Sequence, residues 1–131
     1  DKWFGTRKWV VAAGNAVTAA CFVLLGTREL SLTGATIAMA ALGGFGMTYG
    51  VLMAHGRSFV PDSLLGRGIT LLNVHFIGGD GRMQHLSGAF MTSMAGQPPA
   101  EAFATLHLGF GLLLLLALLV YLFSREHRAE T

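Results

Sequence analysis

The residues of this sequence most able to do chemistry lie between positions 67 and 93, in a stretch that is otherwise mostly apolar or glycine-rich. At about 100° per residue, Asn73, Asp80, Gln84 and Ser87 fall within about 40° of one direction on a helix. They therefore form a polar stripe down one face. Arg82 lies near the opposite face, and a separation of two residues keeps it from facing Asp80. The pattern predicts a helix whose polar stripe contacts protein or water rather than lipid.

The two charged residues of this stretch have two interpretations. An unpaired arginine near the middle of a membrane costs at least about 2.5 to 3.5 kcal/mol on insertion scales. Arg82 either lines a substrate or proton path or is buried against a neighbouring subunit, and the sequence favours neither. For Asp80, the polar stripe favours the path. We predict Asn73, Asp80, Gln84 and Arg82 as the candidate pathway residues.

Other chemistry has little support in the sequence. His75 and His85 are ten residues apart with no carboxylate or thiolate at ligand spacing, which argues against a metal site. The glycine-rich run 78–81 lacks the strand-to-helix context of a phosphate-binding loop, and no nucleophile elbow is present. The net charge of +2 comes without a basic cluster of the kind that binds nucleic acid. We predict a protein that is not an enzyme and holds no metal or cofactor.

The composition excludes an ordinary water-soluble domain. Of the 131 residues, 53% are hydrophobic and only 12% are Asp, Glu, Lys or Arg, whereas a soluble domain has roughly 25% charged residues. The single cysteine, Cys21, excludes an intrachain disulfide framework. The apolar side chains must therefore face a lipid bilayer.

Four long stretches are nearly free of charge and predict four transmembrane helices. A helix needs about 20 apolar residues to cross a bilayer, and the spans are predicted at about 9–26, 30–54, 67–93 and 103–124. The first span has a competing interpretation as a lipoprotein signal that ends at Cys21. Because apolar residues follow Cys21 directly, a span is favoured.

The positions of Lys and Arg predict the orientation. These residues accumulate in short cytoplasmic loops, and an even number of spans places both termini on one face. Seven of the nine basic residues then lie on that face, Arg28 lies on the other, and Arg82 lies within a span. We predict an all-α bundle with both termini cytoplasmic, embedded as a multi-pass protein in a bacterial inner membrane. The seven are Lys2, Arg7, Lys8, Arg57, Arg67, Arg125 and Arg128.

Small residues at four-residue spacing predict where helices pack closely, because they allow backbones to approach in lipid. Such rows are Gly46, Gly50 and Ala54 in the second span and Ala12, Ala16 and Ala20 in the first. Two further features concern single helices. Gly43-Gly44 predicts a bend in the second span, and Pro98-Pro99 followed by Glu101 predicts the start of the fourth.

Two segments resemble the major facilitator superfamily. Residues 1–8, Asp1-Lys2-Trp3-Phe4-Gly5-Thr6-Arg7-Lys8, resemble the Asp-Arg-x-Gly-Arg-Arg/Lys half of its cytoplasmic loop motif, in the copy before the ninth helix, with one residue inserted. The matching positions are Asp1, Gly5, Arg7 and Lys8. The stretch 66–73, with Ile77-Gly78-Gly79 and Met83-Gln84, resembles the eleventh helix of bacterial members.

This resemblance implies that the chain is the last four helices, ninth to twelfth, of a twelve-helix secondary transporter. In that fold the tenth and eleventh helices border the cavity, and the ninth and twelfth are peripheral, which suits the leucine run 112–120. The charges of Asp80 and Arg82 depart from the apolar residues expected there. The implied function is a C-terminal transporter fragment that does not transport alone. The alternative is a non-transporting subunit of a larger membrane complex, and in either case missing helices or other subunits would contact Asp80 and Arg82.

Overall fold

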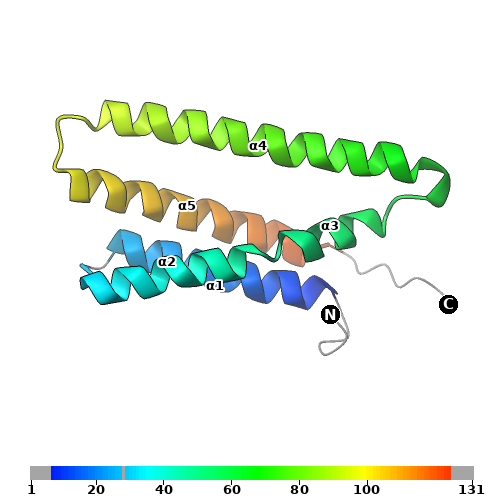
Figure 1. Ribbon diagram of the computed structural model, residues 1–131, viewed down its shortest axis with the longest axis horizontal. Coiled ribbons are helices and arrows are strands. Elements are labelled where there is room, and N and C mark those ends of the chain that lie inside the picture. Colours follow the sequence, from blue (N-terminus) through cyan, green and yellow to red (C-terminus); the bar gives the residue numbers. More distant parts are fainter. Residues whose placement is uncertain (1–6, 28, 125–131) are drawn as a thin grey trace.

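The computed structural model describes residues 7–27 and 29–124, and all regular secondary structure in these residues is helical (Figure 1). The fold-class prediction of an all-α protein is therefore confirmed for the described part of the chain. In chain order the elements are α1 (Arg7–Thr27), α2 (Leu32–Gly46), α3 (Tyr49–Arg57), the short 3-10 helix η1 (Asp62–Leu64), α4 (Leu65–Ser93) and α5 (Pro99–Leu122).

Three helical segments among the described residues are long and apolar enough to cross a membrane: Lys8–Thr27, Leu32–Arg57 and Pro99–Leu122. This supports a membrane-embedded protein. The 29 residues of α4 make it about 44 Å long, which exceeds the roughly 30 Å of hydrocarbon. However, the polar residues and glycines of α4 make it less apolar than the three segments above. A fourth membrane span therefore remains a prediction.

The chain runs back and forth along one axis, so that α1 and α4 run in one direction and the α2–α3 segment and α5 run in the other (Figure 1). The start of α1 and the end of α5 lie at the same end of the bundle, where the Lys8 ammonium donates hydrogen bonds to the backbone oxygens of Leu122 (2.7 Å) and Ser124 (2.6 Å). A cation at this position satisfies carbonyl groups that the end of a helix leaves unpaired. Arg57 and Arg67, at the end of α3 and the start of α4, lie toward the same end of the molecule.

Local sequence signals account for the helix boundaries. The α5 helix begins at Pro99, with Glu101 in its first turn, as predicted from Pro98-Pro99. At the start of α2, the Ser31 side chain accepts a hydrogen bond from the Gly34 backbone N–H at 3.2 Å, which caps the helix. These signals are local in the chain and do not depend on the packing of the bundle.

The second predicted span is broken into α2 and α3 at Met47 and Thr48. The break lies just after Gly43-Gly44, which were predicted to bend this helix. At the break Thr48 lies against α1, because a Cβ built on Gly14 would collide with the Thr48 side chain. The absence of a side chain at Gly14 therefore allows the interrupted backbone to lie close to α1.

The core lies between α1 and α5, which make the most extensive contact in the fold. Buried small residues recur at seven-residue spacing on α1, where Ala12 and Ala19 are buried and Gly26 abuts α5. A Cβ built on Gly26 would lie 2.6 Å from the backbone N of Leu108, and one built on Gly111 would lie 3.1 Å from the backbone N of Val23. Glycine at these two positions permits the close approach of the two helices.

The small-residue rows predicted from four-residue spacing are not the rows that pack within this chain. Ala16 and Ala20 of α1 are exposed, so the packed row on that helix is the seven-residue one. A Cβ at Gly46 or Gly50 would meet nothing within 4 Å, and Ala54 is half-buried. The sequence contained rows of small residues on more than one face, and only the tertiary arrangement selects the face that is covered.

Candidate functional site

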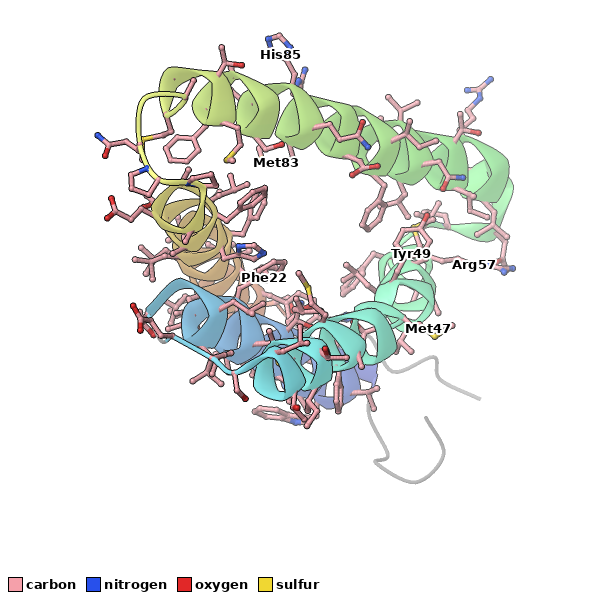
Figure 2. All side chains as sticks on the ribbon, turned by 60° about the vertical axis from the view of Figure 1, so that its left-hand side comes forward. Phe22, Met47, Tyr49, Arg57, Met83 and His85 are labelled. Carbon is pink, nitrogen blue, oxygen red and sulfur yellow. The ribbon has the colours of Figure 1, made fainter. Side chains whose placement is uncertain are left out.

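The α4 helix carries the predicted pathway residues and lies apart from the α1–α5 core (Figure 2). It packs against α3 through its first half and against α5 through its second half. The side of α4 that faces the other helices is apolar and carries Leu72, Phe76 and Met83. The Leu72 side chain lies against Gly56 of α3. Phe76 meets Tyr49 edge-on, with ring centroids 4.8 Å apart and planes at 81°. Apolar contacts with α3 and with α5 thus hold α4 in position at two places.

The polar stripe lies to one side of this inward face. Asn73 is half-buried and accepts a weak hydrogen bond from the Tyr49 hydroxyl at 3.4 Å. Asp80 and Gln84 are exposed. In the described part of the chain, neither the Asp80 side chain nor the Gln84 side chain makes an ion pair or a hydrogen bond. One end of the polar stripe, at Asn73, therefore contacts α3, whereas Asp80 and Gln84 in its middle are exposed.

Arg82 is separated from the other three candidate residues. Helix geometry places it about 160° around α4 from Asp80, and it is exposed without an ion pair among residues 7–27 and 29–124. In hydrocarbon this charge would cost at least about 2.5 to 3.5 kcal/mol. The four predicted residues therefore do not form one site: Asn73, Asp80 and Gln84 share a side of α4, and Arg82 belongs to the other.

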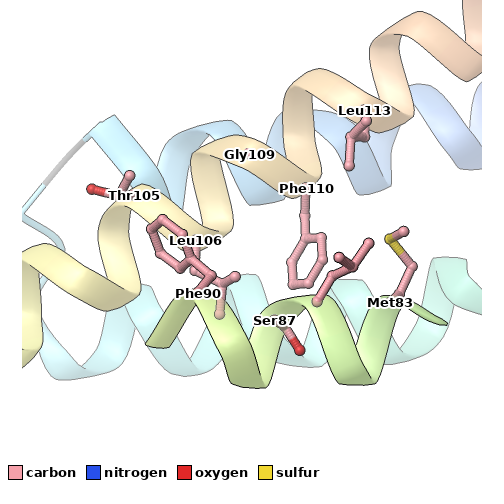
Figure 3. Close-up of a pocket in the computed structure, with 9 residues that line it drawn as sticks. Met83, Ser87, Phe90, Thr105, Leu106, Gly109, Phe110 and Leu113 are labelled. Carbon is pink, nitrogen blue, oxygen red and sulfur yellow. The ribbon is translucent and has the colours of Figure 1, made fainter. Parts of the chain in front are cut away.

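A pocket of about 180 Å³ lies between α4 and α5, beside the inward face (Figure 3). Met83 and Phe90 of α4 and Leu106, Phe110 and Leu113 of α5 contribute apolar walls. Its two hydroxyl groups bond to their own helices, Ser87 to the Gln84 carbonyl at 3.0 Å and Thr105 to the Glu101 carbonyl at 2.9 Å. The pocket can therefore accept an apolar group, and it offers no acid, base or nucleophile.

A buried histidine that the sequence did not single out joins α3 to α5. The side chain of His55 is only 3% exposed, and its Nδ1 lies 2.5 Å from the Tyr121 hydroxyl. The two rings meet edge-on at 90°, and the Phe59 ring packs on the histidine at a centroid distance of 5.2 Å. Nε2 of His55 is buried and has no hydrogen-bond partner among the residues that the structure describes. No spacing pattern could have found this contact, because its two residues are 66 positions apart.

The residues of the predicted cytoplasmic loop motif are described only in part. Asp1 and Gly5 lie outside the described residues, as does the side chain of Arg7. Lys8 is half-buried and serves as the cap of the α5 C-terminus, with its ammonium 6.0 Å from the Trp9 ring centroid. The structure therefore gives Lys8 a role in joining α1 to α5.

The remaining polar groups assemble no metal site. Over residues 7–27 and 29–124, no three His, Cys, Asp or Glu side chains gather closely enough to hold a metal ion. His75 and His107 each direct Nδ1 to a carbonyl of their own helix, at 2.9 Å to Leu71 and 2.6 Å to Phe103. These contacts are local to each helix.

Comparison with known proteins returns no matching protein-family profile, no curated protein of significant similarity and no solved structure of significant similarity. The resemblance to the major facilitator superfamily therefore stays a prediction, based on the residues that carry it.

Proposed function

We propose that this chain is the C-terminal part of a secondary transporter of the major facilitator type, and that α4 contributes the stripe of Asn73, Asp80 and Gln84 to the path of a small solute. The proposal rests first on the three helices that are apolar enough to span a membrane. It rests also on the resemblance of residues 1–8 and of the stretch 66–84 to that family. Four spans cannot supply both halves of a rocking transporter, so transport requires further helices.

The observation that best supports the proposal is the position of the stripe. Asp80 and Gln84 are exposed on a long helix that contacts α3 through its first half and α5 through its second half. A carboxylate within a membrane-spanning helix usually faces a water-filled cavity or a bundle interior, and such residues mark substrate or ion paths. The apolar inward face of α4 fixes the helix, and the stripe beside it remains free to line a cavity.

The experiment is made in two steps. The reading frame upstream of Asp1 is determined first, and eight further spans are expected there. Cells that express the complete protein are then screened for uptake of radiolabelled sugars, amino acids and organic acids. Asp80→Asn is expected to abolish the uptake found, without lowering the amount of protein in the membrane.

Asp62→Asn is the matched control, because Asp62 is an exposed acid in η1, outside the helix that carries the stripe. This variant should transport normally. Normal uptake by Asp80→Asn would remove Asp80 from the path, and an upstream frame without further spans would contradict the transporter proposal itself.

A second candidate function is favoured by Arg82, which faces away from the stripe and has no charged partner in the described chain. On this alternative the chain is a non-transporting subunit that packs into a larger membrane complex. It should then copurify with that complex in a fixed ratio, and a chain that runs alone in mild detergent would argue against it.

A further inference from the structure

The outward side of α4 differs from the side that carries the polar stripe. Figure 2 shows His85 pointing away from the other helices, whereas Met83 points toward the interior of the ring of helices. Arg82 lies about 60° around the helix from His85, and His75, seven residues before Arg82, lies within about 20° of it. All three side chains are exposed. We refer to His75, Arg82 and His85 as the basic flank.

The surroundings of the basic flank are those of a helix contact rather than of a water-filled wall. Leu71 and Val74 are exposed on the same side, at 60% and 61%. A Cβ built on Gly78 or Gly81 would meet nothing within 4 Å, so small residues beside the basic groups leave room for another backbone. Small residues beside polar groups are typical of packed helices in membranes, and a charge inside a membrane usually faces the interior of a bundle or a water-filled cavity.

No acid of the described chain can neutralise this flank. Asp80, the only acid on α4, lies on the other side of that helix, and Glu29, Asp62 and Glu101 lie outside α4 in the connections or in the first turn of α5. A straight helix keeps Asp80 and Arg82 apart whatever rotamers they adopt, because their separation is a property of the backbone. The counter-charge is therefore absent from residues 7–27 and 29–124.

From this arrangement we infer that the basic flank of α4 is a docking surface for a transmembrane helix of a separate membrane protein, which presents an Asp or Glu carboxylate at the level of Arg82. The carboxylate pairs with the guanidinium, and the glycines at 78 and 81 allow the two backbones to approach. The inference rests on the membrane placement and on the subunit alternative, and it does not require transport activity.

The test uses a photoactivatable benzophenone side chain at position 71, where the exposed Leu71 already presents a large side chain on this side of α4, introduced into the full chain in living cells. Irradiation is expected to give one discrete crosslinked protein of fixed size. The same side chain at position 112, on the exposed leucine surface of α5, is the matched control and should give no such product. Arg82→Glu should reduce the discrete product at least tenfold, whereas Asp80→Asn, on the other side of α4, should leave it unchanged.

The charge of the partner is tested by exchange. The crosslinked protein is identified by mass spectrometry, and its membrane-embedded Asp or Glu is changed to Arg. This change should restore crosslinking of the Arg82→Glu chain and weaken crosslinking of the unmodified chain. Lipid adducts at position 71, a product insensitive to Arg82→Glu, a crosslinked second copy of the chain, or failure of the charge exchange would each overturn the inference. Loss of uptake in Asp80→Asn tests the transport proposal separately.

Discussion

Replacing Gly26 by leucine is expected to separate α1 from α5 and to destabilise the whole bundle. The Cβ of any residue at this position would lie 2.6 Å from the Leu108 backbone N and 2.8 Å from the Ala104 carbonyl oxygen. Backbone atoms within a helix cannot rotate aside as a side chain can, so the helices must move apart. We expect a loss of stability of about 1 to 3 kcal/mol or more, the usual range for overpacking.

The chain provides its own probe for this measurement. Cys21 is its single cysteine, and the side chain is buried in α1 at 8% exposure. A fluorogenic maleimide reacts with this thiol only when α1 becomes exposed, so the temperature of half-maximal labelling in detergent reports the unfolding of the core. Gly26→Leu should lower that temperature clearly, and Gly111→Ala should lower it by a smaller amount.

Gly109→Ala is the matched control, because Gly109 is two residues from Gly111 on the same helix and a Cβ there would meet nothing within 4 Å. Its labelling temperature should stay unchanged or rise slightly, since alanine favours a helix more than glycine does. Equal losses at positions 109 and 111 would mean that the α1–α5 contact is not where the helices are most closely packed.

Replacing Tyr121 by phenylalanine is expected to have the second large effect, at the junction of α3 and α5. The change removes the hydroxyl that lies 2.5 Å from Nδ1 of His55 and leaves a buried imidazole with both nitrogens unpaired in the described structure. A buried polar group left without a hydrogen-bond partner costs about 1 to 3 kcal/mol of stability. Cys21 labelling measures the loss.

Tyr49→Phe is the control, because it removes only the exposed 3.4 Å contact with Asn73. This variant should change stability by about 0.5 kcal/mol or less.

A double-mutant cycle isolates the hydrogen bond from the packing of the two rings. His55→Phe combined with Tyr121→Phe removes both polar partners and keeps two aromatic rings in contact. The double variant should be more stable than the sum of the two single losses predicts, by about 0.5 to 3 kcal/mol. Strict additivity would show that the histidine and the tyrosine stabilise the protein independently.

Much of the helical architecture can be predicted from the sequence, because its determinants are local. Charge-free runs of sufficient length predicted the three helical segments that, among the described residues, are apolar enough to span a membrane. The start of α5 at Pro99 followed from two prolines and an acid in the first turn. Each of these features acts through backbone sterics, helix capping or solvation of a single segment, so it needs no information about neighbouring helices.

The position of the break in the second span shows where local signals become insufficient. Gly43-Gly44 indicate a helix that bends easily, yet the helix is interrupted at Met47 and Thr48. At that point Thr48 packs into the space left by Gly14 of α1. Glycines lower the cost of an interruption, and a contact with a distant segment selects its position.

The candidate site was predictable to a similar extent. The sequence placed Asp80 and Arg82 on opposite sides of one helix, since the angle between two residues of a helix depends only on their separation. It grouped Arg82 with the pathway residues, because nothing in the sequence shows which side of α4 faces the rest of the chain. Leu72, Phe76 and Met83 settle this through their contacts with α3 and α5.

The sequence by itself thus determined that this protein is helical and suited to a membrane. It also determined that one helix carries a polar stripe and two charged residues. Composition and periodicity suffice for these conclusions because they act within single segments. Only the tertiary structure decided that Ala12, Ala19 and Gly26 form the packed side of α1 and that His55 meets Tyr121. The physical reason is the same for both. Several sides of each helix carry similar small or polar residues, so the sequence of one helix does not show which side packs. The packing energy that selects one side arises only when a second helix covers it.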